Sequence, residues 1–392
     1  MPPPRKGIGL AAARHAPDGG GMSGTAASPR MLPTLTGVRG IAALMVLFYH
    51  IRGGMTGFAP PQVISVLGQG YLAVDLFFVL SGFVLWWNYG AQFRAQGARG
   101  APHFIMRRFA RIFPLHVAIL SAMALFALAL LVSGRDPGAH YSFVQLPAHY
   151  LLVQNWGFGD RLTWNDPAWS ISTEWAAYLL LAVTGGRIAR LSPGRWSFPL
   201  LIIGLAAGLG AWFAATGRTS IGQDIPATGL LRCLIEFGMG ILLCQWWTAQ
   251  QAGGRTAVIV GTALGFAALG ATLLFSLSQP AAIPLIMVAV VILSLQASVA
   301  AKPLLAGRIA QWLGDISYAV YLSHFFLWIL FKLFFVDDPA MVPPVKIAAF
   351  VIMTLAVSHL LHVWLEVPGR RFAQRAGDRL LAAPKQALTE SR

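Results

Sequence analysis

Apolar residues along the chain gather into runs of about 20, and short polar segments separate the runs. Ten runs stand out, at residues 33–53, 63–88, 112–133, 168–185, 198–216, 229–248, 256–277, 280–299, 310–335 and 345–367. Such a run crosses the hydrocarbon core of a bilayer as a helix, because a helix satisfies its own backbone hydrogen bonds there. The pattern predicts an all-α fold, a polytopic transmembrane helical bundle of about ten helices.

Composition and charge narrow the class of protein further. Hydrophobic residues make up 56% of the chain and charged residues only 11%, whereas soluble domains need roughly a quarter of charged residues to cover their surface. The net charge of +15 is spread over short loops and does not gather into one basic patch. We therefore exclude a soluble domain and a nucleic-acid partner, and we expect membrane lipids around the chain.

Loop charges predict the orientation, because Lys and Arg in short loops stay on the cytoplasmic side. With both termini cytoplasmic, that side holds 21 of the 29 Lys and Arg residues, the opposite side holds seven, and Arg39 lies within the first run. We expect a multi-pass protein of a bacterial inner membrane. Its parts are a disordered cytoplasmic tail at 1–30, a transmembrane domain at 31–367 and a cytoplasmic amphipathic tail at 368–392.

The longest outer loop, at about 134–167, is rich in aromatic, amide and imidazole side chains. They are His140, Tyr141, His149, Gln154, Asn155, Trp156, Trp164, Asn165 and Asp166. Aromatic and amide groups are typical of a sugar-binding surface, and they also form the belt that anchors a protein at the membrane interface. The belt is the favoured interpretation of the loop.

Ionisable residues within the runs are candidates for function, because a charge inside a membrane is costly and faces a cavity or a partner. The seven are Arg39, His50, Asp75, Glu174, Glu236, His324 and Glu366. Glu236 has a local explanation, an ion pair with Arg232 one helical turn earlier.

Arg39 and His50 share one face of the first helix. Eleven residues separate them, which is about three helical turns and about 16 Å of rise. Arg39 lies toward the cytoplasm and His50 toward the outside. A neutral imidazole serves as a general base for a hydroxyl or as a nucleophile that carries an acyl group. The alternative is a histidine that only packs between helices.

Glu174 is expected at a depth close to that of His50. A carboxylate there can orient His50 and stabilise its charged form, as the third member of a catalytic triad does. We expect both groups in one cavity, with Asp75 or His324 as the next neighbour. The alternative is an ion pair of Glu174 with a basic residue of another helix.

Arg108 and Arg111 form an Arg-x-x-Arg pair before the third run. Two forked donors one helical turn apart suit the phosphates of a cofactor. They equally suit lipid headgroups and the positive-inside rule. Taken alone, the pair favours these two explanations over a cofactor site.

Five segments together resemble the membrane-bound acyltransferase family 3, also called the transmembrane acyltransferase family. They are Leu35–Ala43 with the following Tyr49 and His50, Val74–Phe83, Arg108–Pro114, Trp169–Glu174 and Leu313–His324. Glu366-Val367-Pro368 looks like the closing Glu-x-Pro of that family. The segments stand in family order, so the resemblance covers nearly the whole membrane part.

The resemblance implies ten helices, an acyl coenzyme A donor, and a glycan, lipid-linked sugar or small-molecule acceptor on the outer side. We expect acetyl as the acyl group and no metal. The resemblance implies catalysis by His50, and donor handling by Arg39, Arg108 and Arg111. Asp75, Trp169, Ser172, Tyr318 and His324 lie in matching segments and are expected to bind substrate or support the site. Thr36 stands where the family commonly has Asp, which removes one partner for Arg39.

Many members of the family carry a further hydrolase-like domain at the carboxyl end, and we expect none here. Transfer then finishes in the membrane domain or on a separate partner. A homo-oligomer or a separate periplasmic protein is the expected protein partner. Two alternatives of another class are a transporter or flippase of lipid-linked sugars and a structural subunit of a polysaccharide export complex. No paired halves or repeated broken helices favour the transporter.

Overall fold

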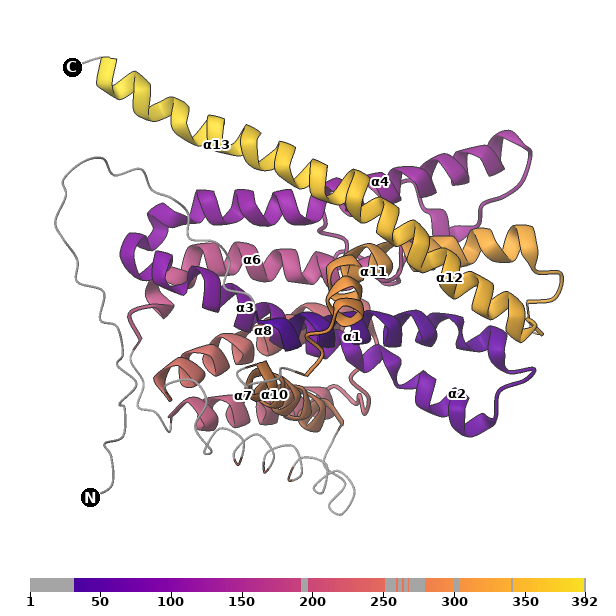
Figure 1. The fold of residues 1–392 in the computed structure, drawn as a ribbon, viewed down its shortest axis with the longest axis horizontal. Helices are drawn as coiled ribbons and strands as arrows, with labels where there is room; N and C mark the ends of the chain where they lie inside the picture. The colour runs from indigo at the N-terminus through magenta and orange to yellow at the C-terminus, as the bar shows by residue number, and fades with distance from the viewer. Residues whose placement is uncertain are drawn as a thin grey trace, which may run out of the picture. The chain divides into compact units, whose positions relative to one another are not determined.

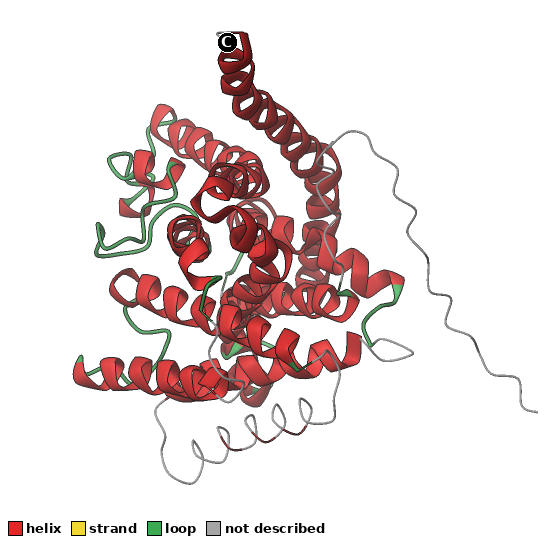
Figure 2. Cartoon of the chain, turned by 90° about the vertical axis from the view of Figure 1, so that its left-hand side faces the viewer, coloured by secondary structure: helices red, strands yellow, loops and turns green. Residues whose placement is uncertain are grey.

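The computed structural model describes residues 32–191, 197–250, 279–298, 304–339 and 341–390, together with positions 259, 263 and 267. This part of the chain consists of helices joined by turns and loops, with no strand among them (Figure 2). The all-α class is therefore confirmed for it. The predicted tail at 1–30 and, apart from those three positions, the predicted run at 256–277 lie outside the described residues.

Most of the predicted runs correspond to one long helix each. The long helices are α1 Pro33–Ile51, α3 Ala73–Gln96, α4 Ala101–Val132, α6 Ala168–Ile188, α7 Ser197–Ala215, α8 Ile225–Ala249, α10 Gln279–Ser298, α11 Arg308–Phe335, α12 Pro344–Leu361 and α13 Val367–Glu390 (Figure 1). Two short helices, α2 Pro61–Gly68 and α5 Leu146–Tyr150, lie in connecting segments.

By length and composition, seven stretches of the described residues can cross a membrane, so the chain is a multi-pass membrane protein. One of these stretches, Pro61–Val132, contains two of the predicted runs. Helix α6 is not among the seven, although it matches the predicted run at 168–185. The number of ten crossings and the location of both termini therefore remain predictions.

Helix α4 begins much earlier than its apolar run predicts. It starts at Ala101, after a short 3-10 turn at Gly97–Gly100, and not at residue 112. Arg107 is on this added segment and forms an ion pair with Asp378 of α13, with 3.5 Å between Nη2 and Oδ2. Hydropathy alone misses such a segment, because one of its faces packs on a neighbouring helix while the other keeps its charges.

The helix that contains the last apolar run continues past the predicted boundary at residue 367. A π-helical segment, η5 (His362–Glu366), joins α12 directly to α13. A π turn changes the hydrogen-bond pattern of the backbone, so Pro368 can follow without breaking the helix. The segment also turns Glu366 into the protein, where its side chain is 1% exposed.

Helices α1 and α11 run parallel and in close contact. A Cβ atom at Gly40 would lie 2.8 Å from the backbone of Gly314, and one at Gly314 would lie 2.2 Å from the carbonyl oxygen of Thr36. Only glycine permits backbones to approach this closely. The same offset of 274 residues relates Gly40 to Gly314 and His50 to His324, so the two helices stay in register along their length.

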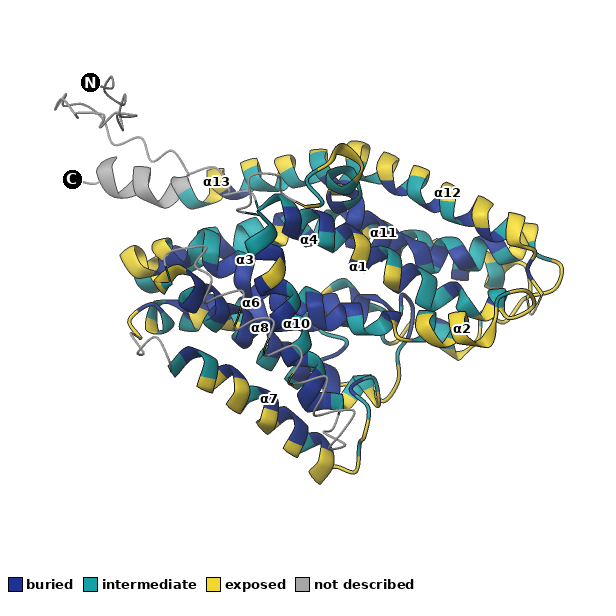
Figure 3. Cartoon of the chain, turned by 60° about the horizontal axis from the view of Figure 1, so that its bottom comes forward, coloured by how far each residue is buried: buried dark blue, intermediate teal, exposed yellow. Residues whose placement is uncertain are grey.

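Burial separates the interior helices from those that face the surroundings. Figure 3 shows mostly buried positions on α1, α3, α8, α10 and α11, and exposed positions along α7 and α12. The exposed positions on α7 and α12 include large apolar side chains such as Leu200, Val345 and Ile352. Because water disfavours such surfaces, these helices are suited to face lipid.

Candidate active site

His50 is hydrogen-bonded to a second histidine, His324 of α11. The distance from His50 Nδ1 to His324 Nε2 is 3.2 Å, and His50 Nδ1 also lies 2.8 Å from the carbonyl oxygen of Val46. His324 Nδ1 lies 2.9 Å from the carbonyl oxygen of Val320. His324 was one of the two neighbours expected after Glu174, and it is the direct partner of His50.

These contacts fix which nitrogens carry protons. A carbonyl oxygen only accepts hydrogen bonds, so Nδ1 of each ring must donate. The neutral His324 then has its lone pair on Nε2 and accepts from His50. The same tautomer leaves the lone pair of His50 on Nε2, which is the atom that a general base or a nucleophile requires.

Arg39 lies toward the other end of the same face of α1 and is also held by α11. Its Nε donates to Ser317 Oγ at 3.0 Å, and its Nη2 donates to the carbonyl oxygen of Gly314 at 2.7 Å. Both ends of the face thus contact α11, as a shared face requires. The contacts also explain why Thr36 is tolerated, because Arg39 takes its partners from α11 and needs no acid at that position.

Arg108 and Arg111 of α4 gather near Arg39. The charges of Arg39, Arg108 and Arg370 all act on Arg111. Arg111 forms an ion pair with Glu366 and lies over the ring of Tyr318, 5.0 Å from its centroid. The Arg111 side chain keeps 23% of its surface exposed.

Arg108 is the less satisfied of the two. Its Nη2 donates to Tyr89 Oη at 3.0 Å, while its buried Nε has no hydrogen-bond partner among the described residues. A buried donor without a partner is expensive, so this nitrogen is suited to an incoming anion.

Glu174 interacts with this arginine group and not with His50. Its carboxylate bonds the hydroxyls of Ser81 and Tyr178, and Arg108 and Arg111 are the charges that act on it. Ser81 Oγ and Tyr178 Oη are themselves 3.0 Å apart. The contacts of Glu174 are thus two hydroxyls, with the arginines acting on it as nearby charges, and the orienting contact expected from Glu174 is made by His324. Sequence reasoning had not singled out Tyr178, because one tyrosine in an apolar run carries no local signal.

Asp75 has a structural partner that the sequence did not reveal. Its two carboxylate oxygens accept from Arg232 Nε and Nη2 at 2.7 and 2.6 Å, and both side chains are at most 1% exposed. The expected pair of Arg232 with Glu236 is present at 4.0 Å. Arg232 binds both oxygens of Asp75, so Asp75 belongs to a buried ion pair, and its expected contact with substrate stays a prediction.

The remaining predicted residues join neighbouring parts of the fold. Ser172 Oγ donates to the carbonyl oxygen of Leu152 at 2.9 Å, and the Trp169 ring packs 5.8 Å from that of Phe78. Tyr318 Oη donates to the carbonyl oxygen of Ile112 on α4 at 2.8 Å. All three thus support the framework around the two groups of charged residues.

The aromatic residues of that loop do not form an interfacial belt as a set. Trp164 is fully buried, and its Nε1 donates to the carbonyl oxygen of Ser142 at 2.9 Å. Tyr141 packs edge-on against it, with 5.4 Å between ring centroids. A belt residue lies at the lipid surface, so the favoured interpretation is wrong for these two residues, which form the interior of a folded loop.

Within the described ranges, no three or more His, Cys, Asp or Glu side chains are placed to share a metal ion. The groups that the site offers are His50 Nε2 at one end of α1 and three arginines near the other end.

Residues 32–363 match the profile of a family described as an acyltransferase domain. The chain belongs to this acyltransferase family. Its membership makes the chain an enzyme that transfers acyl groups, in agreement with the resemblance found in the motifs. The transporter and export-scaffold alternatives are no longer needed to explain the buried charges.

Curated relatives of this acyltransferase agree with the family. The acyltransferase MdmB of Streptomyces mycarofaciens is 30% identical over 75% of this chain and 78% of its own length. The exopolysaccharide production protein ExoZ of Rhizobium meliloti is 27% identical over 66% of this chain and 76% of its own length. The peptidoglycan O-acetyltransferase OatA of Listeria monocytogenes is 22% identical over 76% of this chain and 49% of its own length. No solved structure matches the chain.

Proposed function

We propose that this acyltransferase moves an acetyl group from cytoplasmic acetyl coenzyme A to a hydroxyl of a glycan or a related small molecule on the outer side of a bacterial inner membrane. The observation that carries the proposal is the pair of sites on one face of α1. Arg39 and the α4 arginines offer donors to phosphate, and His50 offers a lone pair about 16 Å further along the helix. The printed names of ExoZ and OatA, which concern an exopolysaccharide and peptidoglycan, favour a glycan acceptor.

His50 would act at the point where the acyl group is transferred from the donor to the acceptor. As general base, Nε2 takes the proton of the acceptor hydroxyl while the hydroxyl oxygen attacks the thioester carbonyl. The carbon–sulfur bond breaks, a carbon–oxygen bond forms, and the proton passes to the leaving thiolate. As nucleophile, the same nitrogen would first attack the thioester carbonyl and release the thiolate of coenzyme A. The acceptor oxygen would then attack the acyl group, the carbon–nitrogen bond would break, and the hydroxyl proton would pass through Nε2 to the thiolate. In both routes His324 Nε2 accepts a hydrogen bond from His50 Nδ1–H and stabilises the positive charge that develops on His50.

The arginine group would hold the donor. Coenzyme A carries several phosphate groups, and forked guanidinium donors match phosphate oxygens. Glu174 lies among these arginines and limits their mutual repulsion when no donor is bound. Its proposed contribution to catalysis is therefore to position the arginines, with an effect on His50 through the bound donor.

Vesicles of defined orientation test the proposed direction of transfer. Inside-out membrane vesicles expose the cytoplasmic face, so we expect them to release coenzyme A from added acetyl coenzyme A, and right-side-out vesicles to release none. Vesicles that contain the His50→Ala variant are the control and should be inactive in both orientations. Equal release from right-side-out vesicles would place the donor site on the wrong side for this proposal.

Arg108→Gln should raise the Michaelis constant for acetyl coenzyme A by about tenfold, because a phosphate contact is lost. The maximal rate should change less, since the contact acts on binding. Arg107→Gln is the matched control on the same helix, because Arg107 bonds His103 and Asp378. Steady-state kinetics of the purified variants test this prediction. An unchanged Michaelis constant in Arg108→Gln would mean that Arg108 only helps to orient the protein in the membrane.

Arg39→Lys should retain only part of the activity, with a loss of about tenfold, because lysine lacks the planar fork that reaches both Ser317 and Gly314. Arg39→Ala should lose more. The measurement is acyl transfer at saturating acetyl coenzyme A. Full activity in the lysine variant would show that charge without geometry suffices at this position.

A further inference from the structure

Arg52 follows His50 by two residues and stacks on a ring that contacts His50. The guanidinium carbon of Arg52 lies 4.0 Å from the ring centroid of Tyr49. The rings of Tyr49 and His50 meet edge to face, with 5.0 Å between their centroids. The charge of Arg52 acts on His50. A cation thus lies one aromatic ring away from the proposed site of acyl transfer.

One edge of the Arg52 guanidinium is free of contacts with the described part of the chain. Nη1 donates to the carbonyl oxygen of Tyr49, whereas Nε and Nη2 have no hydrogen-bond partner among the described residues. These two nitrogens form a planar fork, which matches the two oxygens of a carboxylate or a phosphate. Arg52 can therefore bind an anion through two hydrogen bonds while it stays stacked on Tyr49.

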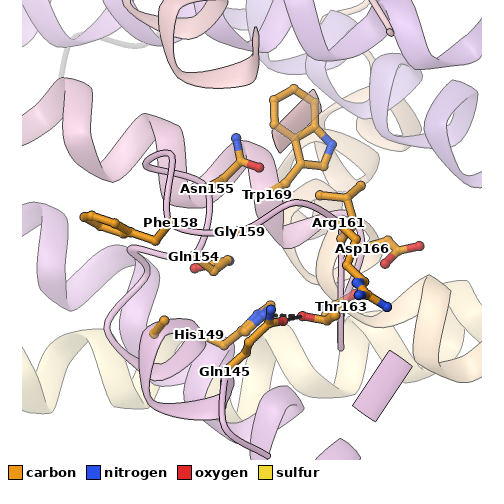
Figure 4. Close-up of a pocket in the computed structure, with 13 residues that line it drawn as sticks. Gln145, His149, Gln154, Asn155, Phe158, Gly159, Arg161, Thr163, Asp166 and Trp169 are labelled. Carbon is orange, nitrogen blue, oxygen red and sulfur yellow. Dashed lines mark hydrogen bonds between the residues drawn. The ribbon is translucent and has the colours of Figure 1, made fainter. Parts of the chain in front are cut away.

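Two other cations that the sequence assigns to the outer side have acidic partners of their own. Arg161, which Figure 4 shows in the loop between α4 and α6, pairs with Asp160 at 3.3 Å. Lys346 at the start of α12 pairs with Asp337 at 3.2 Å. Arg52 has no acidic partner among the described residues, although its side chain is half-buried. Because a partly desolvated charge is costly without a partner, an anion from outside the chain suits this position.

Aromatic rings adjoin both Arg52 and His50. The Tyr71 centroid lies 5.7 Å from that of Tyr49, and the Phe325 centroid lies 5.7 Å from that of His50. Tyr49, Tyr71 and Phe325 are half-buried, so each keeps part of its surface exposed. These rings offer apolar surface next to the reactive histidine, against which the apolar face of a bound sugar can pack.

The charge of Arg52 also bears on the reaction at His50. A positive charge develops on His50 during transfer, and a nearby cation opposes it because like charges repel. An anion bound to Arg52 offsets this repulsion. An acceptor that brings such an anion should therefore react faster as well as bind more tightly, since the anion favours the transition state over the free enzyme.

We propose that Arg52 determines the acceptor specificity of the enzyme by binding a carboxylate or phosphate that the acceptor carries near its reacting hydroxyl. Because only the Tyr49 ring separates Arg52 from His50, one acidic sugar residue can contact both side chains. The inference rests on the proposed function and deepens it by assigning a negative charge to the acceptor.

Purified enzyme in dodecyl maltoside micelles tests the inference, because both faces of the protein are then open to the solution. The probes are phenyl β-D-glucuronide and phenyl β-D-glucoside, in which a carboxylate and a neutral hydroxymethyl group occupy the same position. Mass spectrometry measures the acetylated probe formed from acetyl coenzyme A. We expect kcat/KM to be about tenfold higher for the glucuronide, as the gain of a charge-assisted hydrogen bond implies.

Arg52→Gln should reduce this preference to about one, and Arg52→Lys should retain part of it, because lysine keeps the charge without the fork. The ratio of the two kcat/KM values is the readout, since partial misfolding lowers both values alike. Arg135→Gln is the matched control. It removes the same charge from an exposed position after α4 and should keep the full preference.

Equal transfer to both probes by the unmodified enzyme, including transfer to neither, overturns the inference. So does an unchanged ratio in Arg52→Gln. A loss of rate in Arg52→Gln that is the same for both probes in phosphatidylglycerol vesicles and disappears in micelles assigns the anion to a lipid headgroup, which also overturns the inference.

Release of coenzyme A by inside-out vesicles is recorded in parallel to separate this inference from the proposed function. Release without a preference for the glucuronide overturns the role of Arg52 alone. A preference for the glucuronide in micelles without release by inside-out vesicles overturns the proposed direction of transfer and supports the role of Arg52.

Discussion

Replacing His50 by alanine should reduce acyl transfer by about 10²–10⁴-fold, because proton transfer by a positioned side chain contributes a factor of that size. His324 offers no substitute, since its Nε2 faces the ring of His50 and its Nδ1 is bonded to Val320. The measurement is turnover of the purified variant at equal membrane content. His359→Ala is the matched control, because His359 is an exposed histidine of α12.

A further variant tests the role of His324 as the hydrogen-bond partner of His50. His324→Phe removes the acceptor that stabilises a charged His50, and loss of a hydrogen bond to a charged group corresponds to about 10- to 100-fold in rate. The Michaelis constant for acetyl coenzyme A should stay unchanged, because the donor contacts are remote. Substantial turnover in His50→Ala would remove His50 from the mechanism. A normal rate in His324→Phe would leave Val46 as the group that fixes the His50 tautomer.

Arg232→Met should destabilise the protein by about 3–5 kcal/mol, the usual cost of removing one partner from a buried ion pair. The change leaves Asp75 without its two hydrogen bonds and next to Glu236, whose carboxylate oxygens already have no hydrogen-bond partner among the described residues. Two unpaired carboxylates in a buried site are costly. The midpoint of thermal unfolding in detergent measures the effect.

Arg218→Met provides the matched control for that experiment. Arg218 pairs with Asp224 just before α8, where the two side chains are 24% and 43% exposed. A pair at such exposure contributes about 0–1 kcal/mol because water and salt screen it. The same unfolding midpoint for both variants would mean that the Asp75–Arg232 pair is not a principal support of the bundle.

Local sequence patterns predicted the long helices and, within the site, the shared helix face of Arg39 and His50. Apolar runs give the long helices, since hydrophobicity determines which segments leave water. The helical period places Arg39 and His50 on one face, and both contact α11. The pair of Arg232 with Glu236 was also visible, because it lies within one helical turn. Each of these inferences uses residues that are close in sequence.

Contacts between distant helices were beyond such patterns. Asp75 and Arg232 are 157 residues apart, and no pattern in either segment indicates that the other residue is its partner. Glu174 was assigned to His50 by depth alone, yet side-chain direction around the helix axis turns it to Ser81 and Tyr178. In the loop between α4 and α6, several aromatic and polar residues were noted individually. Only the folded loop shows that Trp164 and Tyr141 are buried in its interior.

Mass spectrometry of surface glycans and secreted metabolites tests the central claim most directly. Cells that carry the unmodified gene are compared with cells that carry His50→Ala at the same chromosomal site, after immunoblots show equal amounts of protein in the membrane. We predict a hydroxylated product that is heavier by the mass of one acetyl group in the first cells and that lacks this mass in the second. Identical acylation of all glycans and metabolites in both strains would contradict His50-dependent transfer of an acyl group to an exported hydroxyl.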